Sequence, residues 1–212
     1  MDFQELKYIY QPAKNAGANT LLLLHGTGGD ERDLLPIAKE FGEDLNILSL
    51  RGNVSENGMP RFFRRSGMGI FDEKDLTFRT HEMVDFIKGL TETEGFDSTK
   101  IIALGYSNGA NIAGSTLVLY PDFLAGAILY RPMQPFKNIE TEVKNTNHTP
   151  VFMSNGMVDP TVKQADTVKY VSILKDIGFD VANYNLSTGH HLTREDLQLS
   201  VDWYKQHFVN NR

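Results

Sequence analysis

The 212-residue chain contains no cysteine, which excludes a disulfide framework, a thiolate metal site and a cysteine nucleophile. Any nucleophile is therefore an oxygen or an amine. The longest apolar run is the LLLL of residues 21–24, far below the roughly 20 residues that a membrane span needs. The opening MDFQELKYIYQP carries acids and lacks the apolar run of a secretory signal. We therefore expect a soluble, cytoplasmic protein with no membrane span.

Basic residues are fewer than acidic ones: the chain has 21 Lys and Arg and 27 Asp and Glu, which gives a formal net charge of -6. An acidic chain offers no electrostatic reason to bind nucleic acid, so no such partner is expected. The composition, 41% hydrophobic and 23% charged, is that of a globular protein and excludes disordered and fibrous classes. Without a repeat or a linker to divide it, the chain is predicted to form a single domain over residues 1–212.

Short apolar runs alternate with segments of helical periodicity, an order typical of an α/β protein with parallel strands. Strands are expected at 5–11, 19–25, 45–51, 100–105, 125–130, 149–155 and 180–187. Helical segments are expected at 34–41, 76–90, 111–120, 160–177 and 194–208. Thr193, three residues before Asp196, suits the capped start of the last helix. The pattern predicts an α/β fold with a mostly parallel central sheet flanked by helices.

A nucleophile motif stands at residues 105–109, GYSNG, between an apolar run and a helical segment. This strand-turn-helix context is the one in which a serine is presented on a sharp turn, and the two glycines let strand and helix approach closely. A hydroxyl needs a base, and the base needs an acid to orient it. Ser107, Asp159 and His190 occur in the required order, each just past a predicted strand.

The assignments of the acid and the base each have an alternative interpretation. Asp159 precedes Pro160, and Asp followed by Pro is a common helix start, so capping alone could account for it. His190 is followed by His191, and adjacent residues at a strand end point in opposite directions. We expect His190, directly after Gly189, to be the base and His191 to pack toward the last helix. No metal-ligand spacing accompanies the pair, so no metal is expected.

An oxyanion loop is predicted at residues 25–29, HGTGG, which follow an apolar strand and lead into a helix. The expected donors to a developing oxyanion are the backbone amides of Thr27 and Asn108. The rival interpretation, a phosphate-binding loop, lacks the lysine of a P-loop, and Asp30 and Glu31 would repel a nucleotide. His25 is expected to brace the loop, and no cofactor is expected.

At these residues the chain resembles the phospholipase/carboxylesterase family of α/β-hydrolases, which includes bacterial carboxylesterases and acyl-protein thioesterases. The resemblance extends over nearly the whole chain, from LLLLHGTGGDERDLLPIA through IIALGYSNGANIA and FMSNGMVDPTV to STGHHLTREDL. It implies an α/β-hydrolase domain without a large lid, triad roles for Ser107, Asp159 and His190, oxyanion roles for Thr27 and Asn108, and a homodimer as a common assembly. GYSNGAN, with Asn where the thioesterases commonly carry Gln, is closer to the bacterial carboxylesterase branch.

These observations predict a serine carboxylic-ester hydrolase that acts through an acyl-enzyme on short to medium acyl or aryl esters, its partner being a small-molecule ester. Thioesterase, acyltransferase and dipeptidase activities could use the same three residues. A binding protein that keeps the hydrolase scaffold without turnover is the alternative from another class.

Two segments, 52–73 and 131–148, interrupt the alternation and are expected to be long loops that line the site. The substrate is expected to lie against their apolar side chains, although such side chains can also pin a loop by packing. These are Phe62, Phe63, Met68, Ile70, Phe71, Met133 and Phe136.

The first of these segments also carries three arginines, Arg61, Arg64 and Arg65. They could donate to an anionic group of the substrate. The alternative is a set of solvated loop charges paired with nearby acids, namely Asp72, Glu73 and Asp75.

Overall fold

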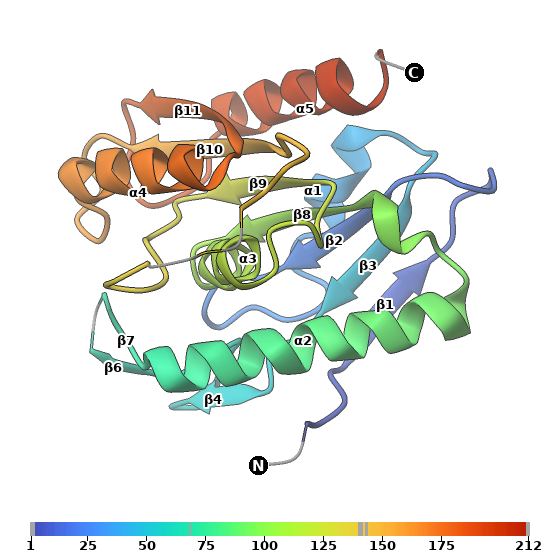
Figure 1. Ribbon diagram of the computed structural model, residues 1–212, viewed down its shortest axis with the longest axis horizontal. Helices are drawn as coiled ribbons and strands as arrows, with labels where there is room; N and C mark the ends of the chain where they lie inside the picture. The colour runs from blue at the N-terminus through green and yellow to red at the C-terminus, as the bar shows by residue number, and fades with distance from the viewer. Residues whose placement is uncertain (1–2, 68, 140–141, 143, 211–212) are drawn as a thin grey trace.

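The computed structural model describes residues 3–67, 69–139, 142 and 144–210. Seven strands form one sheet in the order β1-β3-β2-β8-β9-β10-β11 (Figure 1). They are β1 Tyr8–Gln11, β2 Thr20–Leu24, β3 Asn46–Leu50, β8 Ile101–Tyr106, β9 Gly126–Tyr130, β10 Pro150–Gly156 and β11 Asp180–Leu186. Only β1, at one edge, pairs antiparallel, with β3. The seven expected strands and the mostly parallel sheet are confirmed.

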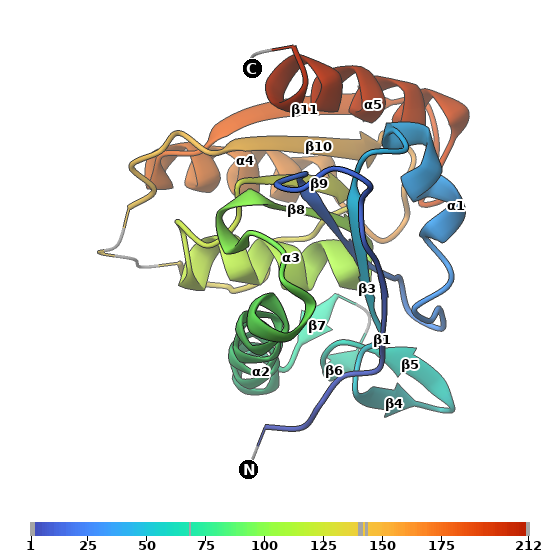
Figure 2. The same ribbon diagram turned by 90° about the vertical axis from the view of Figure 1, so that its right-hand side faces the viewer.

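Helices cover both faces of the sheet, with α2, α3 and α4 on one side and α1 and α5 on the other (Figure 2). Their bounds are α1 Leu35–Ala38, continued by the 3₁₀ turn η1 Lys39–Phe41, α2 Glu73–Glu94, α3 Asn108–Leu119, α4 Gln164–Ile177 and α5 Arg194–Phe208; a second 3₁₀ turn, η2, spans Ser98–Lys100. In β2, Leu22 and Leu24 pack toward the first layer, whereas Leu21 and Leu23 pack toward the second. A strand covered on both faces must be apolar throughout, which is why this one reads as a run of leucines.

Four helices begin at residues other than those expected. Helix α1 starts at Leu35 and α2 at Glu73, against 34 and 76. Helix α3 starts at Asn108, immediately after Ser107, and α4 starts at Gln164 with Lys163 as its N-cap. The alternative in which Asp159 caps α4 is therefore wrong. Helix α5 has the expected bounds, and Thr193 and Asp196 form a reciprocal capping box at its start.

Segment 52–73, expected as a loop, contains two small β-hairpins beside the start of α2 (Figure 1). One pairs β4 Val54–Glu56 with β5 Met59–Arg61, and the other pairs β6 Arg65–Gly67 with β7 Ile70–Phe71. Strands of two or three residues are too short to show an alternating pattern. Asn57 and Gly58, both with positive φ (53° and 81°), make the first turn, and an Asn-Gly pair is a typical hairpin signal.

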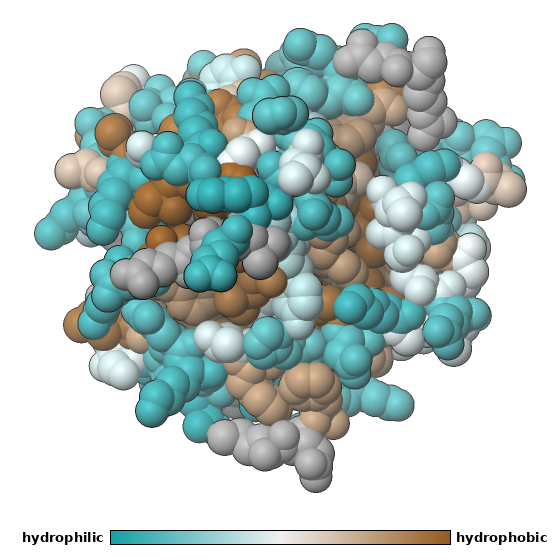
Figure 3. Space-filling model, viewed as in Figure 1, coloured by the Kyte–Doolittle hydropathy of each residue, from teal (hydrophilic) through white to brown (hydrophobic). Residues whose placement is uncertain are grey.

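None of the helices in the described ranges is long and apolar enough to cross a membrane. On the face shown in Figure 3, hydrophilic residues cover most of the surface, and hydrophobic residues show among them in several places.

Candidate active site

Ser107 occupies a strained turn between β8 and α3. Its backbone has φ 52° and ψ -109°, a region that non-glycine residues rarely adopt. The turn is tight, because a Cβ added to Gly109 would lie 1.9 Å from the Leu24 carbonyl oxygen and one added to Gly105 would lie 2.6 Å from the Ala110 nitrogen. Both glycines of the motif are therefore sterically required, and they leave Ser107 at the carboxyl end of the central strand.

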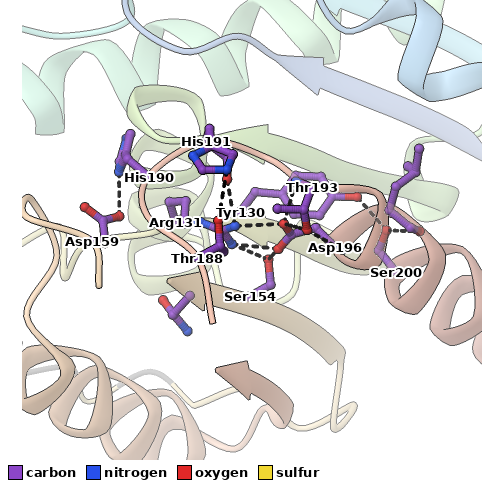
Figure 4. A network of polar contacts seen from close by, with 12 residues as sticks. Tyr130, Arg131, Ser154, Asp159, Thr188, His190, His191, Thr193, Asp196 and Ser200 are labelled. Atoms are coloured by element: carbon purple, nitrogen blue, oxygen red, sulfur yellow. Dashed lines mark hydrogen bonds and ion pairs between the residues drawn. The ribbon is translucent and has the colours of Figure 1, made fainter. Parts of the chain in front are cut away.

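Ser107, His190 and Asp159 form a continuous hydrogen-bonded chain. His190 Nε2 lies 2.9 Å from Ser107 Oγ. On the other side of the ring, His190 Nδ1 lies 2.6 Å from Asp159 Oδ2, a contact shown in Figure 4. The His190 side chain is 31% exposed, whereas that of Asp159 is fully buried. His191 forms its contact elsewhere, with Nε2 3.1 Å from Thr188 Oγ1. The structure thus brings together the three residues singled out in the sequence and places the second histidine outside the chain of contacts.

The charge on Asp159 fixes the tautomer of His190. Burial opposes ionisation of this carboxyl, but hydrogen bonds from the Thr161 hydroxyl and amide and from His190 outweigh it, so the pKa of Asp159 is lowered. An ionised carboxylate can only accept, so the His190 proton sits on Nδ1. Nε2 is then left with a free lone pair that faces Ser107 Oγ, the arrangement a general base requires.

A buried arginine that the sequence interpretation did not include holds the loop carrying His190 (Figure 4). Arg131 follows β9, has φ 55° and is 0% exposed. Its five N–H groups donate to the two Asp196 carboxylate oxygens (2.7 Å each), Ser154 Oγ (3.0 Å), Gly189 O (3.1 Å) and His191 O (2.9 Å). The carbonyls on either side of His190 are therefore fixed by one guanidinium. Sequence offered only a weak signal, an arginine directly after a wholly apolar strand.

Asp196 links this arginine to the start of α5. Burial raises the pKa of its carboxyl, but bonds from Arg131, Ser154 and Thr193 more than offset that effect and lower the pKa overall. The ionised carboxylate both neutralises the buried guanidinium and completes the capping box. Loop position and helix start therefore depend on the same charge.

His25 braces the predicted oxyanion loop, as expected from the sequence. Its Nδ1 lies 2.7 Å from Gly26 O, and Gly52 N donates to its Nε2 at 3.1 Å. Because Nδ1 faces a carbonyl oxygen and Nε2 accepts from an amide, the ring is neutral with its proton on Nδ1. Burial lowers the pKa of His25, which also favours the neutral ring. Gly28 N also donates to Pro60 O at 2.9 Å. The loop bearing Thr27 is thus tied to the β4–β5 hairpin.

Two asparagines of α3 hold the two irregular segments against the site. Asn108 Oδ1 accepts from Phe62 N, and Asn111 Oδ1 accepts from Met133 N, both at 2.7 Å. The backbone amide of Asn108 is the first of α3 and has no acceptor within the helix. The asparagine of GYSNG therefore has a packing reason of its own, because its side chain anchors segment 52–73.

A cavity of about 280 Å³ opens over Ser107. Thr27, Asn108 and His190 line it, together with Phe71 and Met133 from the two irregular segments. A neighbouring cavity of about 250 Å³ shares Gly69, Phe71 and Met133 and adds the apolar Pro132, Pro135, Phe136 and Val162. The second cavity also has charged lining residues, namely Glu73, Lys137, Lys163, Asp166 and Lys169. A bound molecule can therefore extend from the compartment at Ser107 into a second one of mixed character.

Several expected substrate contacts lie elsewhere. Phe62 and Phe63 are 2% and 0% exposed and belong to the core, where Phe62 packs on His25 at 4.7 Å between ring centroids. The alternative interpretation, packing that pins the loop, describes these two side chains. Ile70 is 53% exposed and lines neither cavity, and Met68 lies outside the described residues.

The three arginines of segment 52–73 occupy two different environments. Arg61 and Arg65 line the Ser107 cavity and share the carboxylate of Glu56. Arg64 is exposed, and its backbone amide, not its side chain, binds Asp75. The alternative, in which these side chains pair with acids 72, 73 and 75, is therefore not found among the described contacts. Among the residues described here, no group of three acids or histidines could hold a metal ion.

Comparisons with known proteins agree with this geometry. A model of the family described as Phospholipase/Carboxylesterase matches residues 6–207. MhqD of Bacillus subtilis, named as a hydrolase, is 45% identical over 96% of this chain and 100% of its own. The crystal structure of a carboxylesterase from Bacillus cereus superposes with a TM-score of 0.92 at 41% identity, covering 96% of this chain and 95% of the other. The structure of YahD with malic acid gives 0.89 at 32% identity, covering 95% and 99%.

Proposed function

Because the chain belongs to the phospholipase/carboxylesterase family and has the fold of a carboxylesterase, we propose that it is a serine carboxylic-ester hydrolase. It acts through an acyl-enzyme on short to medium acyl or aryl esters. The observation that carries this proposal is the contact chain from Ser107 Oγ to His190 Nε2 (2.9 Å) and from His190 Nδ1 to Asp159 (2.6 Å). Nucleophile, base and orienting acid stand in the relation that acyl transfer demands.

In the acylation step, Ser107 Oγ attacks the ester carbonyl carbon while His190 Nε2 takes the hydroxyl proton. The imidazolium that forms is stabilised by the Asp159 carboxylate. The carbonyl oxygen becomes an oxyanion, and we expect the backbone amides of Thr27 and Asn108, two residues that line the cavity, to bind it. Collapse of the tetrahedral intermediate breaks the bond to the alcohol, which leaves with the proton from His190.

Deacylation repeats the same steps with water. His190 removes a proton from a water molecule, the hydroxide attacks the acyl carbon, and Ser107 leaves with the returned proton. The volume of the cavity, about 280 Å³, is consistent with a small substrate, because it suits a compact ester group. The malic acid bound in YahD is a small carboxylic acid, the class of product that an ester hydrolase releases.

The test is activity across a p-nitrophenyl acyl-chain series with Ser107→Ala beside the wild type. We expect kcat to fall about a thousandfold or more, because only the oxyanion donors and substrate binding remain. Ser98→Ala, at an exposed serine of η2, is the matched control and should keep wild-type kcat.

Intact mass after a fluorophosphonate probe gives a second readout. The wild type and Ser98→Ala should gain one adduct, and Ser107→Ala should gain none. Labelling of Ser107→Ala would refute the nucleophile assignment, and an unlabelled, inactive wild type would indicate a binding protein on this scaffold. Rates on matched oxoester, thioester and amide substrates then distinguish esterase from thioesterase and peptidase activity.

A further inference from the structure

The Ser107 cavity has a positive wall in a chain of net charge -6. Arg61, at the end of β5, and Arg65, at the start of β6, both line it. Among the described residues that line this cavity, no aspartate or glutamate is present. The positive wall is therefore opposite in sign to the net charge of the chain.

Glu56 is the counter-ion that these two arginines share. Its Oε1 lies 3.0 Å from Arg65 Nε, and its Oε2 lies 3.2 Å from Arg61 Nε. The second contact is misaligned, since Glu56 Oε2 makes no hydrogen bond within the described chain. One carboxylate therefore faces two guanidinium groups at the wall of the cavity.

Arg61 is 2% exposed but incompletely hydrogen-bonded. Its Nε donates to Phe63 O at 3.1 Å and its Nη1 to Thr27 Oγ1 at 2.5 Å. A guanidinium carries five N–H groups, so the described part of the chain leaves three of them, both on Nη2 among them, without an acceptor. Burial and the neighbouring Arg65 lower the pKa of Arg61, and the opposing effect of Glu56 does not cancel them.

A guanidinium whose donors are unused by the protein is favourable only when water or a ligand in the cavity supplies acceptors. We propose that Arg61 and Arg65 form a carboxylate-binding subsite and that the preferred substrate is an ester that carries a free carboxylate. The fork of N–H groups on an arginine matches the two oxygens of a carboxylate, which can accept two parallel hydrogen bonds.

The position of the subsite limits the length of that substrate. Arg61 Nη1 donates to the side chain of Thr27, the residue whose backbone amide is an expected donor to the oxyanion. The carboxylate and the scissile ester are therefore separated by only a few atoms. This inference rests on the proposed ester hydrolysis and adds to it the chemical class of the substrate.

The experiment compares kcat/KM for a carboxylate ester and its neutral isostere. On the acyl side the pair is p-nitrophenyl hemiglutarate and its methyl ester, and on the alcohol side it is 4-acetoxybenzoate and methyl 4-acetoxybenzoate. We expect the wild type to prefer the anionic member of one pair, and the pair that shows the preference locates the carboxylate.

Variants of the arginines then show which side chains cause the preference for the anionic ester. Arg61→Met should reduce the anionic-to-neutral ratio at least about tenfold, which corresponds to the loss of one charged hydrogen-bonded pair. Arg65→Met should reduce it several-fold, and Arg61→Lys, which keeps the charge without the fork, should fall between Arg61→Met and wild type. Arg64→Met is the matched control, because it removes the same charge from an exposed position of the same segment and should leave the ratio unchanged.

A readout without turnover separates this inference from the proposed function. Glutarate binding to Ser107→Ala, measured by calorimetry, should be weakened by adding Arg61→Met and unaffected by adding Arg64→Met. A wild type that cleaves neither ester refutes the function and leaves this binding test standing. An unchanged ratio in Arg61→Met and Arg65→Met, or an equal drop in Arg64→Met, overturns the subsite.

Discussion

Arg131 and Arg61 are both almost fully buried beside the same serine, yet they are partnered in opposite ways. Arg131, 0% exposed, places all five N–H groups on protein acceptors and has Asp196 to itself. Arg61, 2% exposed, makes two hydrogen bonds to the described chain and shares Glu56. A buried charge that the protein satisfies completely stabilises structure, whereas one left with open donors at a cavity can bind a ligand.

The region that Arg131 organises is the loop of His190, and the largest effect is expected there. His190→Ala should lower kcat by about a thousandfold or more, because the base is lost. His191→Ala should cost less than about tenfold, since its ring contacts Thr188 and not Ser107. Single-turnover acylation, with both variants shown to be folded by circular dichroism, measures the difference. The reverse order of the two variants would identify His191 as the base.

The structural role of Arg131 is tested by the effect of Arg131→Met on stability. The substitution leaves the Asp196 carboxylate buried without its cation, so the free energy of unfolding in urea should fall by about 3 kcal/mol or more. Arg131→Met combined with Asp196→Asn removes the stranded charge and keeps a residue that can cap α5, so the double variant should be more stable than Arg131→Met alone. If the double variant is no more stable, the buried charge is not the cause.

The loss of stability in Arg131→Met should not be accompanied by a loss of the preference for anionic esters. In Arg131→Met the ratio of kcat/KM between the anionic and neutral esters should stay at its wild-type value, because Arg131 does not line the Ser107 cavity. A ratio that collapses together with stability would remove the distinction between the two arginines.

A smaller effect is expected from His25, which braces the loop that joins Arg61 to the oxyanion site. Its pKa is lowered from 6.5 in the folded state, so its stabilising contribution is present above pH 6.5 and is lost as pH falls below it. Between pH 7.5 and 5.5 the wild type should lose stability with a slope of at most about 1.4 kcal/mol per pH unit. Urea unfolding of His25→Gln, which cannot titrate, should show a flatter profile over this range.

The smallest expected effect concerns the Thr27 hydroxyl. Thr27→Val keeps the backbone amide but removes the acceptor of Arg61 Nη1, so kcat for the neutral ester should fall less than about tenfold. Thr27→Ser keeps the acceptor and should match the wild type. A loss in Thr27→Val as large as that in His190→Ala would mean that the side chain, not the amide, stabilises the oxyanion.

The site residues that could be named from the sequence are those that follow strands. Ser107, Asp159 and His190 each stand just past an apolar run, and the carboxyl ends of parallel strands meet at one edge of a sheet. Local order along the chain was therefore enough to predict that these three side chains converge. The start of α4 was predicted too early, because Asp159 and Pro160 look locally like a helix start while the carboxylate binds His190, a residue far along the chain.

By itself, then, the sequence determined the sheet, the helices and the order of the catalytic candidates, since apolar periodicity and glycine positions act over a few residues. Only the tertiary structure decided which arginine is structural and which faces the cavity. The partners of Arg131 come from three distant segments, and burial of Phe62 and Phe63 depends on how the hairpins dock on α3. Such contacts between distant segments leave no periodic signal in the chain, because each is set by the packing of the whole fold.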